Sequence, residues 1–301
     1  MQNPLFDLAK GEFKTGLAKL NQKDKWQDDR TDLSGPFRLK FPEVEGWGES
    51  LLLTSLLKRE AINTKTPVKV FADWQVCSIL KQDSDSVFDA VQGEGDKEVR
   101  SPLAILRHAL TGKLLDKPFI PLKLPGRPFP PTTNRRPQIG IAWASITDGH
   151  PIDQKSIALE PFLSSLANIS GEFVSLQRNL RVADPDGLLK EFGARIVRDE
   201  VLNARCPSSL ATLVEEIRQL DCLVTISTTT THLAASLGIP VELIATERKG
   251  PQWFWEAQAH HKRCLYPTVN VHIGDGETGN WWKKCLKEVT DSLSGLRKNN
   301  G

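Results

Sequence analysis

The sequence lacks a long apolar run. Its longest apolar-looking stretch, Leu51–Leu57, is interrupted by Thr54 and Ser55 and is far shorter than the roughly 20 residues that cross a bilayer. The segment Met1–Phe13 contains no apolar core of the length found in signal peptides. We therefore expect a cytoplasmic protein without a transmembrane segment, able to work on lipid-borne substrates at a membrane face.

The sequence also lacks an excess of charge of one sign. Lys and Arg total 39, Asp and Glu total 37, and the formal net charge is +2. Proteins that bind the nucleic-acid backbone usually carry a larger, clustered basic excess. The composition therefore argues against nucleic acid as a partner.

Paired cysteines are missing as well. The five cysteines form no Cys-x-x-Cys pair, and without an export signal we interpret them as free thiols. His260, His261 and Cys264 lie close together, but a zinc site needs about four ligands at a recognisable spacing. We therefore expect no bound metal and no cofactor.

Two Asp-x-Asp pairs, Asp83-Ser84-Asp85 and Asp184-Pro185-Asp186, have a spacing that can hold a divalent metal. The pair at 83–85 lies in a polar turn. The pair at 184–186 has the pattern of a helix start, with Pro185 at the first helical position. We interpret both as structural.

A proline-rich stretch divides the chain. Seven prolines fall between Pro118 and Pro137, and proline excludes both a helix interior and a central strand. We interpret the stretch as a linker. The predicted organisation is a helical N-terminal extension over residues 1–30, a domain over 31–120, a linker over 121–137 and a second domain over 138–301.

The second half alternates between short apolar runs and amphipathic segments. The predicted strands cover 138–144, 172–177, 194–197, 222–226 and 241–245. The predicted helices cover 159–167, a segment opened by Asp184, 208–220 with Ser208 as N-cap, and 229–237 ended by Gly238 and Pro240. This alternation is typical of a doubly wound parallel α/β sheet.

The first half is a weaker βαβ pattern. We predict strands over 36–41 and 68–72, with helices over 48–59 and 102–110. The fold class is thus α/β, with two Rossmann-like domains facing a cleft. Ligands bind beyond the carboxyl ends of strands in such sheets.

Three loops of this fold are candidates for chemistry. In the first, Gly46, Trp47 and Gly48 let the backbone approach a ligand, and Glu49 supplies a carboxylate that can take a proton. The alternative is a tight strand-to-helix turn with Glu49 in the first helical turn.

The second loop runs from Ser227 to His232 and contains four consecutive threonines. At a helix N-terminus their hydroxyls and N–H groups suit a phosphate, and His232 adds a charge-assisted bond to a diphosphate. A serine cap before an ordinary buried helix is the alternative. We favour a binding site because the fold places ligands there.

The third loop contains Trp143, Ala144 and Ser145, with Lys155 downstream to balance phosphate charge. A lone lysine in a polar loop is also often only solvated. The chain has eight tryptophans, and aromatic residues gather near the C-terminus: Trp253, Phe254, Trp255, Tyr266, Trp281 and Trp282. These rings suit stacking on bases and sugars, or pinning of a C-terminal helix across a domain interface, equally well.

Taken together, these segments resemble glycosyltransferases akin to the ADP-heptose:lipopolysaccharide heptosyltransferases, in the version often fused behind tetratricopeptide repeats. The resemblance runs from about Trp26 to the C-terminus, and Leu8–Trp26 is similar to the last helix of a repeat array. The matching segments are Gly46-Trp47-Gly48-Glu49, Ser101-Pro102-Leu103, Ile139–Ala144, Lys155-Ser156-Ile157, Phe173–Gln177, Ser227–Ala234, Trp253-Phe254-Trp255 and Tyr266-Pro267.

The resemblance implies a GT-B fold with an acceptor-side first domain and a second domain that holds a nucleotide-sugar donor. It implies donor binding by Lys155, Ser227, Thr228, Thr229 and His232, joined by Trp143 and Ser145, with Glu49 deprotonating the acceptor hydroxyl. Two departures stand out, because the family has aspartate where this chain has Ser227 and Glu49.

Two functions follow. The first is a metal-independent glycosyltransferase, for hexosyl or heptosyl transfer, whose acceptor is a carbohydrate, a lipid-linked glycan or a protein. The second is a catalytically inactive GT-B-fold protein that serves as a binding or scaffold partner. The two departures favour the second, whereas His232 together with a carboxylate at position 49 favours the first.

Overall fold

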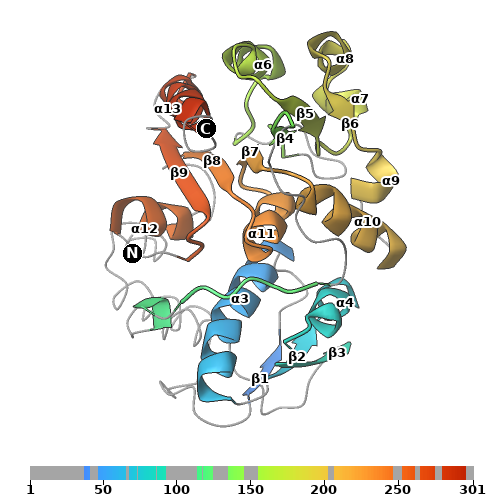
Figure 1. Cartoon of the computed structure of the whole chain (residues 1–301), viewed down its shortest axis with the longest axis vertical. Coiled ribbons are helices and arrows are strands. Elements are labelled where there is room, and N and C mark those ends of the chain that lie inside the picture. The colour runs from blue at the N-terminus through green and yellow to red at the C-terminus, as the bar shows by residue number, and fades with distance from the viewer. Residues whose placement is uncertain are drawn as a thin grey trace, which may run out of the picture. The chain divides into compact units, whose positions relative to one another are not determined.

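The computed structural model describes residues 37–40, 47–65, 68–72, 74–85, 87–92, 114–116, 118–124, 135–145, 155–202, 207–246, 253–261, 265–274 and 280–295. The chain separates into two compact units (Figure 1). Unit 1 comprises Met1–Pro125, Ser236–Gly238 and Trp253–Pro267, and unit 2 comprises the remainder. The predicted N-terminal extension, the helix over 102–110 and the middle of the proline-rich stretch lie outside the described residues.

Unit 2 is built on a six-stranded parallel sheet. Its strands are β4 (Gln138–Ala142), β5 (Glu172–Ser175), β6 (Arg195–Ile196), β7 (Cys222–Ile226), β8 (Val241–Thr246) and β9 (Val269–Gly274). They lie side by side in the order β6-β5-β4-β7-β8-β9 (Figure 1). Chain order therefore reverses between β4 and β7, as in dinucleotide-binding Rossmann sheets.

Five of these strands match the predicted ones, whereas β9 was not predicted. The strands β7 and β8 are buried at every position and mostly apolar, and such runs are easily recognised. In β9 buried and more exposed residues are mixed, and Asn270 and His272 interrupt the apolar pattern.

The helices of unit 2 are α6 (Leu159–Leu166), α7 (Leu180–Ala183), α8 (Leu188–Phe192), α9 (Asp199–Leu202), α10 (Pro207–Arg218), α11 (Thr229–Ser236) and α13 (Trp282–Gly295). The first buries Leu159, Phe162, Leu163 and Leu166, which share one face at helical spacing. This face joins Ile139 and Ile141 of β4, Val224 of β7 and Val289 of α13 in one core. Each such side chain contributes about 1.5–3 kcal/mol when fully buried.

Two predicted helix starts are wrong. Asp184 does not open a helix, because it follows α7 and its carboxylate accepts the N–H groups of Leu188 and Leu189 at 2.7 and 3.1 Å. It therefore caps α8 from upstream. Ser208 is not an N-cap but the second residue of α10, which begins at Pro207, a residue favoured at the first helical position.

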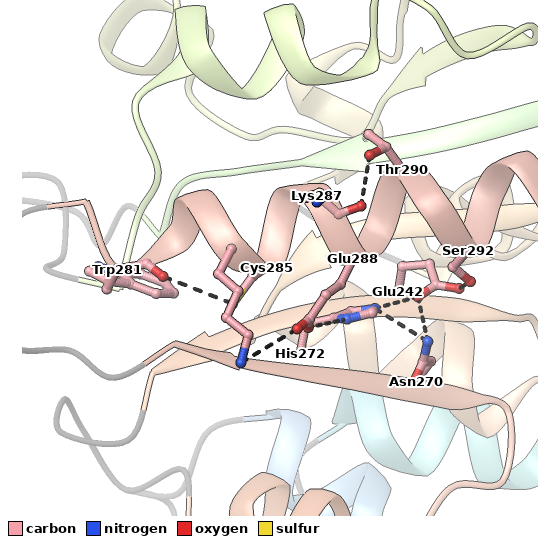
Figure 2. Close-up of polar contacts among 10 residues, drawn as sticks. Glu242, Asn270, His272, Trp281, Cys285, Lys287, Glu288, Thr290 and Ser292 are labelled. Atoms are coloured by element: carbon pink, nitrogen blue, oxygen red, sulfur yellow. Dashed lines mark hydrogen bonds and ion pairs between the residues drawn. The ribbon is translucent and has the colours of Figure 1, made fainter.

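A buried polar network fastens α13 to the sheet of unit 2 (Figure 2). His272 of β9 lies 2.6 Å from Glu242 of β8 through Nε2 and 3.2 Å from Glu288 of α13 through Nδ1. Glu242 also accepts hydrogen bonds from Asn270 at 2.9 Å and Ser292 at 2.6 Å. Trp281 and α13 thus belong to unit 2, whereas Trp253–Pro267 clusters with unit 1.

Unit 1 contains a parallel sheet of β1 (Phe37–Lys40), β2 (Val68–Ala72) and β3 (Phe88–Gln92). Its helices are α3 (Trp47–Thr64), α4 (Trp74–Gln82) and α12 (Trp253–His261), with a 3₁₀ turn η1 over Leu114–Asp116. The predicted strands and the first helix are confirmed, whereas α4 and β3 were not predicted. Every residue of α3 from Leu51 to Arg59 is buried, so this stretch of the helix has no exposed polar face for periodicity to reveal.

Lys58, buried on α3, is paired with two carboxylates. Lys58 Nζ lies 2.7 Å from Asp83 Oδ1 and 2.9 Å from Asp85 Oδ2, and it donates to the carbonyl oxygen of Pro121 at 2.8 Å. The structural interpretation of Asp83-Ser84-Asp85 is therefore confirmed. These contacts tie the start of the proline-rich stretch to α3 and α4.

Candidate functional site

The reversal between β4 and β7 brings two of the candidate loops together in unit 2. Ala142 pairs with Thr225, so Trp143–Ser145 and Ser227–Thr229 leave adjacent strands at the same edge of the sheet. Figure 1 shows β4 and β7 side by side in this sheet. Open α/β sheets bind ligands at the carboxyl ends of strands at such a reversal point. Both loops were predicted as donor-binding segments.

The loop after β7 leads into α11 through a local cap. The hydroxyl of Thr231 accepts the N–H of Thr228 at 3.1 Å and donates to the carbonyl oxygen of Ile226 at 2.7 Å. Thr231 is therefore structural. Thr228, Thr229 and Thr230 are half-buried around the helix N-terminus, where the first N–H groups have no partner within the helix.

His232 lies in the first turns of α11 and is 3% exposed. Burial, and to a lesser degree the positive charge of Lys155, lower the pKa of His232 to about 3. The imidazole is therefore neutral near pH 7, which corrects the expectation of a charge-assisted bond from His232. Because the charge of Lys155 contributes to this pKa, Lys155 and His232, predicted from different segments, lie close enough to interact electrostatically.

The loop after β4 is held by its stem. The N–H of Ile157 donates to Trp143 O at 2.9 Å, and the N–H of Ser145 donates to Ser156 Oγ at 2.9 Å. Ser145 and Lys155 are half-buried at this stem. The stem thus places both near the end of β4.

Trp143 takes no part in the site through its side chain. Its ring is 1% exposed and packs in the core, with its centroid 6.2 Å from that of Phe162. The enclosure of the indole in the core argues against a donor contact through this ring, and the donor-binding role of Trp143 stays a prediction.

Gln177 belongs to this site and was not predicted as a site residue. It follows β5, is 3% exposed, and its Oε1 accepts the N–H groups of Trp143 at 3.1 Å and Ala144 at 2.9 Å. Its Nε2 donates to the carbonyl oxygens of Ala144 and Arg178, each at 3.0 Å. The signal in the sequence was a lone amide directly after an apolar strand.

The third candidate loop belongs to unit 1. Helix α3 begins at Trp47, which places Glu49 in the first helical turn and Gly48 at a buried position. Gly46 and the side chains of Trp47 and Glu49 lie outside the described residues. The catalytic role of Glu49 stays a prediction.

The C-terminal aromatic residues pack inside the two units. In unit 1, Trp255 and Tyr266 are fully buried with ring centroids 6.2 Å apart, and Phe254 lies against Trp255. In unit 2, Trp281 is 6% exposed in the core beneath α13. The burial of these four rings within their own units argues against stacking on a base or sugar, and the pinning of a helix across a domain interface is not tested by these contacts.

The described residues contain no group of three or more His, Cys, Asp or Glu side chains able to hold a metal ion. Of the neighbouring His260, His261 and Cys264, only the side chain of His260 belongs to the described part of the chain. Within the same described part of the chain, no helix is long and apolar enough to span a membrane.

The sequence matches no protein-family model and no curated protein. Solved structures of sugar transferases share its fold. One is a glycosyl transferase family 9 protein from Veillonella parvula, with a TM-score of 0.52 at 10% identity over 87% of this chain and 89% of that chain. Another is the E. coli ADP-heptose LPS heptosyltransferase II, with a TM-score of 0.54 at 13% identity over 88% of this chain and all 100% of that one.

A third similar structure is the dodecameric iron-containing heptosyltransferase TibC in complex with ADP-D-beta-D-heptose, with a TM-score of 0.53 at 12% identity over 88% of this chain and 77% of that one. At these identities the likeness establishes the fold. The chain has the α/β fold of GT-B glycosyltransferases, built from two Rossmann-like units.

Proposed function

We propose that this protein is a glycosyltransferase that moves a sugar from a nucleotide-diphosphate sugar to an acceptor hydroxyl without a bound metal. One observation carries the proposal. The two loops predicted to bind the donor leave adjacent strands β4 and β7 at the reversal point of the sheet, and Lys155 and His232 are electrostatically coupled there.

The residues of unit 2 suit a diphosphate. Lys155 supplies positive charge, and the first N–H groups of α11 with the hydroxyls of Thr228 and Thr229 supply donors at the favourable end of a helix dipole. Neutral His232 can donate one ring N–H to a phosphate oxygen. Ser227 and Ser145 lie at the ends of the same two strands.

The reaction assigned to these residues is a displacement at the sugar's anomeric carbon. The bond between this carbon and the diphosphate oxygen breaks, and a bond to the acceptor oxygen forms. The acceptor's proton passes to the Glu49 carboxylate, and the leaving diphosphate takes the electron pair of the broken bond. Lys155 and the α11 amides stabilise that charge.

The test begins with ligand binding. Thermal unfolding is measured with ADP, GDP, UDP and CDP and with their sugar conjugates, because a ligand that binds the native state stabilises it by about 2.7 kcal/mol at a hundred times its Kd. Lys155→Met should remove the shift. Lys287→Met, which removes an exposed charge from α13 of the same unit, should keep it.

Transfer is then measured with each donor that binds, across carbohydrate, lipid-linked glycan and protein acceptors. Sugar transfer by the parent supports the proposal. Donor binding without transfer would instead favour the inactive GT-B-fold binding or scaffold protein, the alternative that Ser227 and Glu49 favour as departures from the family pattern. Absence of any thermal shift would contradict a nucleotide site altogether.

A further inference from the structure

Gln177 uses all the hydrogen-bonding capacity of its amide on the loop after β4 and on its own neighbour. Its oxygen accepts two consecutive N–H groups, from Trp143 and Ala144, and its nitrogen donates to two carbonyl oxygens. Neither glutamate nor methionine, which have similar lengths, can make this set of bonds, because glutamate lacks the donors and methionine lacks both donors and strong acceptors.

The next residue of the loop is bonded as well, because the N–H of Ser145 donates to Ser156 Oγ. The N–H groups of three consecutive residues after β4 are thus bonded within the protein. In dinucleotide-binding sheets with the same strand order, the turn after the first strand offers its backbone to the pyrophosphate. Here that backbone is occupied by Gln177 and Ser156.

We infer that Gln177 is the positioning residue of the donor site. It fixes the loop after β4 so that a diphosphate meets the loop through its side chains, Ser145 and Lys155, and meets backbone amides at the N-terminus of α11. The inference rests on the proposed function. It adds that the loop after β4 contacts the phosphates through side chains, whereas the loop before α11 contacts them through backbone amides.

The chain offers a matched control in unit 1. Gln258 Oε1 accepts the consecutive N–H groups of Leu265 and Tyr266, both at 3.0 Å, and Gln258 Nε2 donates to Tyr266 O at 2.9 Å. Replacing either glutamine by methionine removes the same kind of bonds from a buried segment. Comparing the two variants therefore distinguishes a general loss of stability from a displacement of the loop after β4.

Calorimetry on the full chain tests the inference with three probes: the tightest-binding nucleoside diphosphate among ADP, GDP, UDP and CDP, inorganic pyrophosphate, and the corresponding nucleoside. Gln177→Met should weaken the first two by about tenfold, since displacement of a binding group by about an ångström costs that much or more. Nucleoside binding should stay as in the parent. Gln258→Met should lower the melting temperature comparably and bind all three probes as the parent does.

Ser156→Ala provides a milder variant should Gln177→Met not fold. It removes only the acceptor of the Ser145 N–H and should weaken the two phosphate-bearing probes in the same direction, by a smaller factor. Parent-like binding of these probes by the folded Gln177 variant, or by Ser156→Ala in its place, would overturn the inference while leaving the proposed function intact. A parent that binds no nucleoside diphosphate would overturn both.

Discussion

His232 shows how burial changes the chemistry of a single side chain. The sequence places it one turn into a helix at the ligand-binding edge, and the structure leaves it 3% exposed with its pKa lowered to about 3. The positive charge expected from histidine is therefore absent near pH 7. Lys155 provides the positive charge that acts on this position instead.

His232→Ala should weaken nucleotide-sugar binding by about 0.5–1.5 kcal/mol, the worth of a neutral hydrogen bond, rather than the roughly 1.5–3 kcal/mol of a charge-assisted one. Because the histidine is neutral, the donor Kd of the parent should stay constant between about pH 5 and 8. Calorimetry with a nucleotide sugar, whose diphosphate does not titrate in this range, measures both quantities. Exposed His260→Ala is the control, and tighter binding toward acid pH would contradict the prediction.

Glu49 stands in the first turn of α3, where the resemblance places the catalytic base. Glu49→Gln keeps the size of the side chain but cannot accept the acceptor's proton. Turnover should fall by about 10²–10⁴-fold while donor affinity stays unchanged, because the proposed donor site belongs to unit 2. Steady-state rates for a transferred sugar measure the effect.

Glu49→Asp separates a base from a helix-end charge. It retains a carboxylate, one methylene shorter, and should recover much of the turnover that the glutamine variant loses. A favourable charge in the first helical turn predicts less than about 1 kcal/mol of lost stability and parent-like rates for Glu49→Gln. Rates of that kind would remove Glu49 from the mechanism.

At the scale of elements, α13 is held to β8 and β9 through a titratable side chain (Figure 2). Burial disfavours the charged form of His272, but hydrogen bonds with Glu242 and Glu288 outweigh it and raise the pKa of His272. Asn270 and Ser292 also face Glu242, and Lys284 lies 3.6 Å from Glu288. Protonated His272 thus joins carboxylates from a strand and a helix.

A histidine whose pKa is raised in the folded state stabilises the fold fully below its unfolded pKa, and this stabilisation is lost as pH rises through the folded pKa. The free energy of unfolding should therefore decline as pH rises from about 6.5. His272→Gln should lower stability by about 1.5–3 kcal/mol at pH 6 and remove this part of the decline. Urea unfolding from about pH 6 to 9 measures it.

Exposed His260 of α12 provides the control for this pH series, because His260→Gln also removes one titratable ring. That variant should follow the parent at every pH. An unfolding free energy of His272→Gln that declines with pH as steeply as that of the parent would show that the network does not hold α13 through charge.

At the scale of the whole molecule, the fold is that of GT-B transferases although the sequence is only 10–13% identical to the structures compared. The fold alone does not specify the reaction, because one fold hosts many activities, so the residues at the sheet edge carry the functional proposal. One of these structures, TibC, is an iron-containing heptosyltransferase, so the metal dependence of donor binding by this chain can be tested.

Dialysis against EDTA should leave nucleotide-sugar affinity and the melting temperature unchanged. The physical reason is that Lys155 and the N-terminus of α11 can hold the diphosphate charge that a divalent cation holds elsewhere. Calorimetry before and after dialysis checks the affinity. Loss of binding that added Mg²⁺, Mn²⁺ or Fe²⁺ restores would contradict metal-independent binding.

Five of the six strands of unit 2, and its two candidate donor-binding loops, could be predicted from the sequence. Cys222–Ile226 and Val241–Thr246 are mostly apolar runs, interrupted by Thr225, Glu242 and Thr246, and Gly238 with a φ of 82° ends α11 where expected. Such signals are local, because a buried strand or a glycine with positive φ can be recognised from a few neighbouring residues. The edge strand β9 and the buried stretch Leu51–Arg59 of α3 give weaker signals, since neither has a regular alternation of apolar and polar residues.

The burial, protonation and hydrogen bonding of the site residues depend on the tertiary structure and could not be predicted from the sequence. The burial of Trp143 against Phe162, the neutral form of His232 and the clamp from Gln177 each depend on side chains that are distant along the chain. The same holds for Lys58, whose partners Asp83 and Pro121 come from separate segments. Periodicity reports which face of an element is apolar, whereas desolvation, charge coupling and hydrogen bonding depend on which elements meet.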